Sequence, residues 1–449
     1  MIYQLLKLTV AVGLRIFFKS FSVHKPYDLP TSGPIIVVGN HPNTFMDPFI
    51  LATLFKQQVG FLGNASIFVN GFVNSIFKYF GVIPIYRQQD VAPNTAPDNR
   101  KTFSACYAHL EKKKAIMLFP EGTSFHELKL RKIKTGTARI ALGVEEINNF
   151  NLGVRIIPVG LYYSNPSKFR SKIYVNIGEM ISVDSYKDSF LEDQNETVVS
   201  LTKAIRQSLE KLTIQTADKD QESLFFKIKR IYKSQLTDSI DPKDKKEEFR
   251  ITKEISNAIQ YFNVVLPEKF ESIKNKIDRC DVLLNKFKTS AVKIPNIENR
   301  LLSYFKVFFG LLYSIATIPF LVYGLIQNYL PFNIPYWIAN SITKLKEYHA
   351  PIMLTLGIFL FPIYYGLSYW LFNAYFELSG IEKIIYVVSL PISGYFALHY
   401  YNFYQKGIIF ARTVMTYRSS KIMIMELELL RNEIINDLDE AKEIYLNRL

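Results

Sequence analysis

The sequence predicts an α/β domain, in which a mixed sheet is flanked by helices, followed by a helical region and C-terminal transmembrane helices. Up to about residue 215, short β-branched runs alternate with longer stretches of helical periodicity, the pattern of a sheet covered by helices. After residue 300, long runs without charge are typical of membrane-crossing helices. The 449 residues have room for two or three domains, and their 49% hydrophobic content excludes a disordered protein.

Composition favours a membrane over nucleic acid as the partner of this basic chain. Lys and Arg outnumber Asp and Glu by 54 to 40, and the net charge of +14 suits an acidic partner of some kind. With 35 Phe and 28 Tyr, however, the chain carries more apolar surface than soluble nucleic-acid binders usually do. We therefore expect a phospholipid membrane as a partner, and no nucleic acid.

Metal and disulfide chemistry are not indicated. The two cysteines, Cys106 and Cys280, lie far apart and form no paired metal or redox motif, and the histidines lack metal-ligand spacing. We expect no metal and no cofactor, so catalysis has to come from other side chains.

The N-terminal segment, residues 1–25, is predicted to be an amphipathic helix in the membrane interface. Lys7, Arg15 and Lys19 fall within one arc of a helical wheel, and apolar residues fill most of the remainder. A helix packed on its own domain would show the same pattern, so both interpretations stay open.

Residues 26–215 are predicted to form the α/β domain. Six β-branched runs are read as strands: 35–38, 59–62, 82–86, 115–119, 155–159 and 173–177. Four intervening segments are long enough for helices: 44–55, 66–80, 97–113 and 135–147.

Residues 216–300 are predicted to form charged helices. Lys, Glu, Asp and Gln are dense there, and apolar residues recur at helical spacing. Basic residues, among them Lys276 and Arg279, gather towards the end of this stretch. They form either a solvated helix face or a collar that attracts anionic headgroups before the membrane.

Residues 301–405 are predicted to be the transmembrane region. Three uncharged runs, 307–343, 350–376 and 384–405, each exceed the roughly 20 residues that cross a bilayer. Residues 406–449 turn charged again and form an amphipathic C-terminal helix. Basic residues flank the region on both sides, which three full crossings do not satisfy, so the Pro-containing first run is expected to enter and return or to cross twice.

A His/Asp pair stands where the first predicted strand ends. In the run Gly39-Asn40-His41-Pro42-Asn43-Thr44-Phe45-Met46-Asp47-Pro48, Asp47 is close enough to fold back on His41. A carboxylate on one ring nitrogen leaves the other as a base for a hydroxyl proton.

At these residues the sequence resembles the glycerolipid acyltransferases, which acylate glycerol-3-phosphate and lysophosphatidic acid. The resemblance rests on four blocks in order: residues 39–48 above, Gly81-Val82-Ile83-Pro84-Ile85-Tyr86-Arg87, Phe119-Pro120-Glu121-Gly122-Thr123-Ser124, and Ile156-Ile157-Pro158-Val159-Gly160. It implies that residues 26–215 are an acyltransferase domain, and the membrane-rich C-terminal half lies outside it.

Two departures from the family pattern bear on the site. Five residues separate His41 from Asp47 where most of the family has four, a form that looks like the branch including fungal-type glycerol-3-phosphate acyltransferases. We expect Asn43 to cap the following helix and so absorb the extra residue. Many members also have an Arg where this chain has Ser124, and Arg131 or Lys134 are the candidates to replace it.

The resemblance assigns the catalytic roles. His41 would be the general base and Asp47 its orienting partner. His126 is the nearby rival base.

The same resemblance assigns the substrate-binding roles. Arg87 would bind the acceptor's phosphate, and Lys134 would add a second charge, although a surface ion pair and a solvated lysine are the plain alternatives. Gly122 would let the backbone approach a ligand, Thr123 would donate to an oxygen, and Glu121 would serve acceptor hydroxyls or site structure.

The function implied is acyl transfer at a membrane. The expected partners are acyl-CoA or acyl carrier protein as co-substrate and a phosphorylated glycerol acceptor, glycerol-3-phosphate first and lysophosphatidic acid as the alternative. A non-catalytic lipid-binding scaffold would have no reason to keep His41, Asp47, Arg87 and Glu121 together. The positive-inside rule places the catalytic domain of this integral membrane protein on the cytoplasmic side.

Overall fold

The computed structural model describes most of the chain and divides it into two compact units. The described residues are 2–65, 71, 75, 79, 81–85, 99–238, 241, 244–286, 300–416 and 421–448. The first unit comprises Met1–Gln215 with Ala339–Leu354, and the second comprises Thr216–Ile338 with Thr355–Leu449. Each unit is a fold of its own and is taken separately below.

The first unit is built on a mixed sheet. Its strands are β1 (Ser20–His24), β2 (Ile35–Gly39), β3 (Val59–Asn64), β4 (Val82–Ile85), β5 (Ala115–Leu118), β6 (Arg155–Tyr163), β7 (Lys172–Ile177) and β8 (Ile181–Ser182). The order is β1-β7-β6-β2-β5-β3-β4, with β8 also paired to β6. The pairs from β6 through β2, β5 and β3 to β4 are parallel, whereas β6 runs antiparallel to β7 and β8. The carboxyl ends of the parallel strands therefore share one edge.

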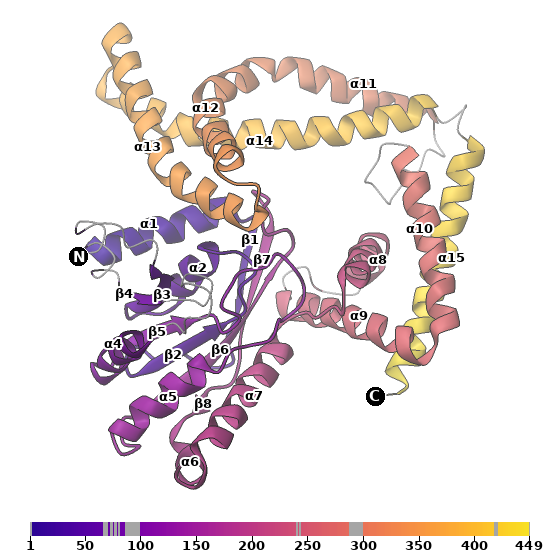
Figure 1. The fold of residues 1–449 in the computed structure, drawn as a ribbon. Coiled ribbons are helices and arrows are strands. Elements are labelled where there is room, and N and C mark those ends of the chain that lie inside the picture. Colours follow the sequence, from indigo (N-terminus) through magenta and orange to yellow (C-terminus); the bar gives the residue numbers. More distant parts are fainter. Residues whose placement is uncertain are drawn as a thin grey trace. The chain divides into compact units, whose positions relative to one another are not determined.

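Helices cover both faces of this sheet. Figure 1 shows α1 (Ile2–Phe17) and α2 (Met46–Leu54) over one face, with α4 (Arg100–Glu111), α5 (Gly136–Ile147) and α7 (Gln194–Leu212) over the other. The short α6 (Lys187–Glu192) precedes α7. Strand β2 is buried along its whole length, so it reads as a continuous apolar run. Its side chains alternate: Ile36 and Val38 join the core under α5 and α7, while a Cβ at Gly39 would meet Leu51 of α2.

Where the structure describes them, the predicted strands and helices of this unit agree with it, with two differences. All six predicted strands are present, and β1 and β8 are additional. The predicted helix 66–80 lies largely outside the described residues. The N-terminal helix ends at Phe17, where residues 1–25 were expected to be helical, because Ser20–His24 pairs with β7 instead.

Helix α1 turns an apolar stripe outward. Leu14 and Phe17 are buried, and the Lys7 ammonium donates to the Phe55 carbonyl at the end of α2. Lys7 therefore belongs to the packed face and not to a solvated arc. The large apolar residues left exposed recur every three or four positions: Ile2, Leu5, Leu8, Val12 and Ile16. The exposed face of this helix is the apolar one.

The second unit contains a charged helical bundle. It consists of α8 (Lys219–Asp238), α9 (Lys245–Val265), α10 (Pro267–Lys286) and α15 (Lys421–Leu446). Lys276 pairs with Asp437 at 2.7 Å and Arg279 with Glu426 at 2.5 Å, joining α10 to α15. These two cations were candidates for a headgroup collar, and the structure uses them to hold the C-terminal helix instead. That helix is amphipathic as predicted, and Ile434 is fully buried.

The apolar helices of the second unit are α11 (Arg300–Ala316), α12 (Ile318–Ile342), α13 (His349–Phe376) and α14 (Gly380–Thr416). Within the described part of the chain, two stretches are long and apolar enough to cross a membrane, Lys346–Phe376 and Gly380–Ala411. The pair α11 and α12 passes the same test only as one bent element, with a bend of 54°. The break falls at Thr317, between the two helices, and not at Pro331 or Pro335 inside α12.

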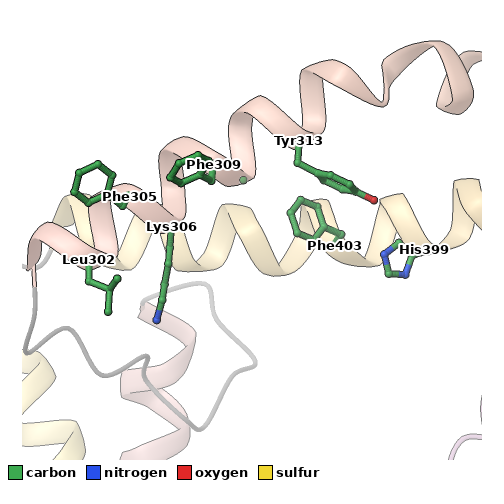
Figure 2. A pocket seen from close by; sticks show the side chains of 8 residues that line it. Leu302, Phe305, Lys306, Phe309, Tyr313, His399 and Phe403 are labelled. Carbon is green, nitrogen blue, oxygen red and sulfur yellow. The ribbon is translucent and has the colours of Figure 1, made fainter.

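Polar contacts join these helices, and an apolar groove lies between two of them. Asn328 of α12 donates to the Leu390 carbonyl of α14 at 3.3 Å and accepts from the Tyr365 hydroxyl of α13 at 2.6 Å. Such interhelical hydrogen bonds help to fix helices in lipid. A groove of about 650 Å³ lies between α11 and α14, lined by Leu302, Phe305, Lys306, Phe309, Gly310, Tyr313, His399 and Phe403. Figure 2 shows how these residues lie along the two helices. An apolar lining of this kind suits contact with lipid chains.

The division into units predicts an even number of crossings. Residues 339–354 belong to the unit that contains the sheet. We therefore expect the stretch 300–342 to begin and end on the same membrane side. We expect single cysteines at exposed Glu192 and Glu443 to be labelled by a membrane-impermeant maleimide from one side of sealed vesicles. A cysteine at Ser379, between α13 and α14, should be labelled from the other side. Labelling of positions 192 and 443 from opposite sides would contradict this topology.

Candidate functional site

The shared edge of the parallel strands gathers the predicted site residues. His41 follows β2, Glu121 follows β5, and Tyr163 ends β6. The Asn40 side chain extends the pairing of β2 with β6, because its amide donates to the Leu161 carbonyl at 3.0 Å and its oxygen accepts the Leu161 N–H at 2.7 Å. The loop that carries His41 is thereby fixed to the end of β6.

His41 and Asp47 form the predicted pair. The His41 Nδ1 lies 2.9 Å from Asp47 Oδ2, and since a carboxylate only accepts, Nδ1 carries the proton and Nε2 keeps a free lone pair. The ring stacks on Phe119 with centroids 4.1 Å apart. The His41 side chain is 15% exposed and that of Asp47 is fully buried. This is the arrangement of a general base that is oriented from behind and open at one nitrogen.

Two further donors satisfy the buried Asp47 carboxylate. The Asn43 N–H donates to Oδ2 at 2.7 Å, and the Tyr163 hydroxyl donates to Oδ1 at 2.5 Å. Burial and the neighbouring Asp47 charge raise the pKa of Tyr163 well above its usual value, so this hydroxyl stays protonated and remains a donor.

A tight turn absorbs the extra residue between His41 and Asp47. The Met46 N–H donates to the Asn43 carbonyl at 2.8 Å, and Thr44 inside the turn has φ +28°. The expectation that Asn43 caps α2 is wrong: Phe45 is the N-cap residue, and the Asn43 side chain donates to the Pro166 carbonyl at 2.8 Å.

Glu121 braces the site through both carboxylate oxygens. Oε1 accepts the His41 N–H at 2.9 Å and Oε2 accepts the Arg131 N–H at 3.1 Å. Burial raises the pKa of Glu121, while these two amide donors act in the opposite direction. Of the two predicted uses of Glu121, these bonds favour site structure.

Gly122 and Lys134 lie against each other. A Cβ at Gly122, whose φ is +79°, would come within 2.6 Å of the Lys134 Nζ. The Lys134 ammonium therefore lies directly over the glycine turn that follows β5. The backbone N–H of Lys134 is not free for a ligand, because it donates to the Pro120 carbonyl at 2.8 Å. Thr123 follows in the same turn and is partly exposed.

The other predicted site residues are less well placed or not described. The Arg131 guanidinium stacks on Phe125 and donates to both oxygens of Glu127, at 2.9 and 3.1 Å. Its charge is already paired, which leaves Lys134 as the better replacement for the missing Arg. Arg87, two residues beyond β4, lies outside the described residues.

The rival base, His126, lacks the arrangement that makes His41 suitable. Burial lowers the pKa of the His126 ring, although the nearby Glu347 charge acts to raise it. Of these two histidines, His41 is the one whose ring nitrogen lies within hydrogen-bond distance of a carboxylate. Among the described residues, no cluster of His, Cys, Asp and Glu has the arrangement of a metal site.

Tyr163 is the functional residue that sequence reasoning missed. It lies three residues beyond the fourth block, among other buried strand residues, and a tyrosine there reads as core. The parallel pairing of β6 with β2 could have indicated that the end of β6 reaches the His41 loop.

Part of the chain is similar to known proteins. Residues 20–162 match the acyltransferase family model. Residues 20–162 form a glycerolipid acyltransferase domain. The chain is 35% identical over 136 residues to glycerol-3-phosphate O-acyltransferase 2 of Saccharomyces cerevisiae, covering 30% of this chain and 18% of that protein.

Two other relatives match the same part of the chain. Glycerol-3-phosphate O-acyltransferase 1 of Saccharomyces cerevisiae is 29% identical over 31% of this chain and 19% of its own length. The chloroplastic 1-acyl-sn-glycerol-3-phosphate acyltransferase LPAT1 of Arabidopsis thaliana is 28% identical over 34% and 39%. The chain thus spans less than half the length of each of these acyltransferases.

The contacts of Asp47 in the acyltransferase domain predict a graded loss of activity. Asp47→Asn replaces one carboxylate oxygen, which accepts hydrogen bonds, by an NH2 group that would face hydrogen-bond donors. The His41 ring would then lose its orientation, and kcat should fall by at least about a hundredfold. Tyr163→Phe removes one hydrogen bond to a charged group, and kcat should fall by about tenfold. Tyr162→Phe, at a buried neighbouring tyrosine, controls for lost packing. Equal rates for the Tyr162 and Tyr163 variants would show that Tyr163 only fills space.

Proposed function

We propose that this protein is a membrane-bound acyltransferase that transfers a fatty acyl group from acyl-CoA or acyl carrier protein to the hydroxyl of glycerol-3-phosphate. The observation that carries the proposal is the His41 ring, held by Asp47 at Nδ1 and open at Nε2. The family of the domain supports the reaction class, and the yeast relatives support the acceptor.

The proposed chemistry needs only groups of this chain and the two substrates. His41 Nε2 takes the proton of the acceptor hydroxyl while that oxygen attacks the thioester carbonyl. The carbon–sulfur bond then breaks, and the departing thiolate receives the proton from His41. Asp47 holds the imidazole and stabilises its charged form between these two transfers. The thioester is already activated, so no enzyme nucleophile is required.

The acceptor phosphate is assigned to the side of the site where Lys134 lies over Gly122. Among the described residues, the Lys134 ammonium forms no ion pair, so its charge is available to a phosphate. Arg87 is proposed as the second cation on the strength of the family resemblance. Thr123 is proposed to donate to a glycerol or phosphate oxygen.

Lysophosphatidic acid is the second candidate acceptor. The Arabidopsis relative, named for 1-acyl-sn-glycerol-3-phosphate, covers a similar share of this chain. Both acceptors carry a phosphate and a free hydroxyl, so one site chemistry serves either. The higher identity to the yeast relative favours glycerol-3-phosphate.

The catalytic unit is proposed to act at the cytoplasmic membrane surface. The exposed apolar stripe of α1, from Ile2 to Ile16, would lie in the interface, and α13 and α14 would anchor the chain. Basic residues that follow the last apolar run favour the cytoplasmic side.

The deciding experiment is an assay of the purified full-length protein. Labelled acyl-CoA and acyl carrier protein are each offered with glycerol-3-phosphate and with lysophosphatidic acid, and the products are separated as lipids. We expect transfer to glycerol-3-phosphate, and a rate about 10²–10⁴-fold lower in His41→Ala. The His126→Ala variant should stay active. No transfer to either acceptor from either donor would refute the proposal.

Lys134 gives a separate test of the phosphate site. Lys134→Ala should raise the KM for the phosphorylated acceptor by about tenfold, since one hydrogen bond to a charged group is worth about 1.5 kcal/mol. The KM for the acyl donor should change little. Lys132→Ala, at an exposed lysine two residues away, is the matched control. A raised donor KM with an unchanged acceptor KM would move Lys134 to the thioester side.

A further inference from the structure

The unit that contains the sheet includes a segment from the membrane half of the chain. Residues 343–349, here called the connector, run from the end of α12 to the first residue of α13 and belong to the first unit. The connector folds on itself: the Leu345 N–H donates to the Thr343 hydroxyl at 3.1 Å, and the His349 Nε2 lies 2.9 Å from the Thr343 carbonyl. The Tyr348 N–H also donates to the Leu345 carbonyl at 3.2 Å. The connector is therefore a compact turn and not an extended linker.

The connector touches the loop that carries the catalytic pair. The Thr44 hydroxyl donates to the Glu347 carbonyl at 2.7 Å, and Thr44 is only 7% exposed. Thr44 stands between His41 and Asp47, inside the turn that absorbs the extra residue. This hydrogen bond joins two residues that are 303 positions apart in the sequence.

Thr44 needs such a partner because its backbone is strained. A φ of +28° is rare for a β-branched residue, and a strained conformation of this kind persists only where the surrounding structure holds it. The turn matters for catalysis because it sets the Asn43 N–H on the carboxylate that orients His41. A shift of the turn would move both members of the catalytic pair.

The connector also lies near the second loop of the site. The Lys346 and Glu347 charges act on the partly buried His126 ring. The neighbouring Phe125 N–H donates to the His41 carbonyl at 3.1 Å. The connector thus borders both loops that surround His41.

We propose that the connector is a positioning element of the active site, and that it acts through the hydrogen bond from Thr44 to the Glu347 carbonyl. The inference rests on the proposed acyltransferase function. It means that the membrane half does more than anchor the enzyme, because the segment between two of its apolar helices completes the support of the catalytic loop. Catalytic rate should then depend on residues outside the acyltransferase domain.

Three substitutions at Thr44 separate the hydrogen bond from the backbone strain. Thr44→Val keeps the shape and loses the hydroxyl, and kcat should fall by about two- to twelvefold, the range expected for one hydrogen bond. Thr44→Gly relieves the positive φ but also loses the hydroxyl, and it should be impaired as well. Thr44→Ser keeps the donor and should retain most of the rate. The KM values of both substrates should change little, because Thr44 supports the loop and does not bind substrate.

A connector variant tests whether the effect passes through this contact. Lys346→Gly, Glu347→Gly and Tyr348→Gly together keep the chain length but loosen the turn. The loss of kcat should match that of Thr44→Val, and combining the two changes should add little more. The matched control places three glycines at Glu377, Leu378 and Ser379, between α13 and α14, and should leave kcat unchanged.

Hydrogen exchange of the full-length protein gives a readout that does not depend on activity. Peptides covering residues 40–48 should exchange faster in the Thr44→Val and connector variants than in the wild type or the control. The positioning role would be wrong if the wild type is active and these variants keep both its kcat and its exchange rates. An inactive wild type whose loop still exchanges faster in the variants would refute the acyltransferase function and leave the contact standing.

Discussion

The structure of the active site depends on the burial of one carboxylate. Asp47 is fully buried, and an ionised carboxylate without partners in such a place would cost several kcal/mol. Its partners come from separate parts of the chain: the His41 ring and the Asn43 amide from the loop after β2, and the Tyr163 hydroxyl from the end of β6. The requirement to satisfy Asp47 therefore fixes loop and strand together. Oriented this way, His41 has one nitrogen left for chemistry.

Glu121, after the neighbouring strand β5, also joins separate loops by accepting hydrogen bonds. Its oxygens accept hydrogen bonds from the backbone N–H groups of His41 and Arg131, so the loops after β2 and β5 are joined through a second, partly buried carboxylate. The two acidic residues that sequence reasoning singled out thus act by accepting backbone hydrogen bonds as much as by any contact with substrate. Parallel strands make this possible, since only their shared carboxyl edge brings the two loops side by side.

The sequence predicted most of the elements and the central pair, and it failed where contacts are distant. Strand runs such as 35–38 and 155–159 are apolar throughout, and burial on both faces makes such runs easy to recognise. The short spacing of His41 and Asp47 is a local relation, which one loop can satisfy. Tyr163 lies 116 residues from Asp47, and no local pattern records that its hydroxyl points to the carboxylate. The edge strand β1 was missed for a related reason, because its half-exposed residues continue the apolar pattern of α1 and pair only with the distant β7.

The basic residues of α10 show why charge patterns alone misassign surfaces. Before the structure, Lys276 and Arg279 fitted a membrane collar as well as a solvated face, since a run of cations does not reveal its counter-ions. The carboxylates that pair with them belong to α15, more than 140 residues further along the chain. Contacts between segments far apart in the sequence occur in both units: α15 with α10 in the second, and the connector with the Thr44 loop in the first. In each unit a late segment of the chain supplies a partner that an early segment cannot find locally. A cut between the domain and the membrane half would therefore remove structural partners from the regions that precede it.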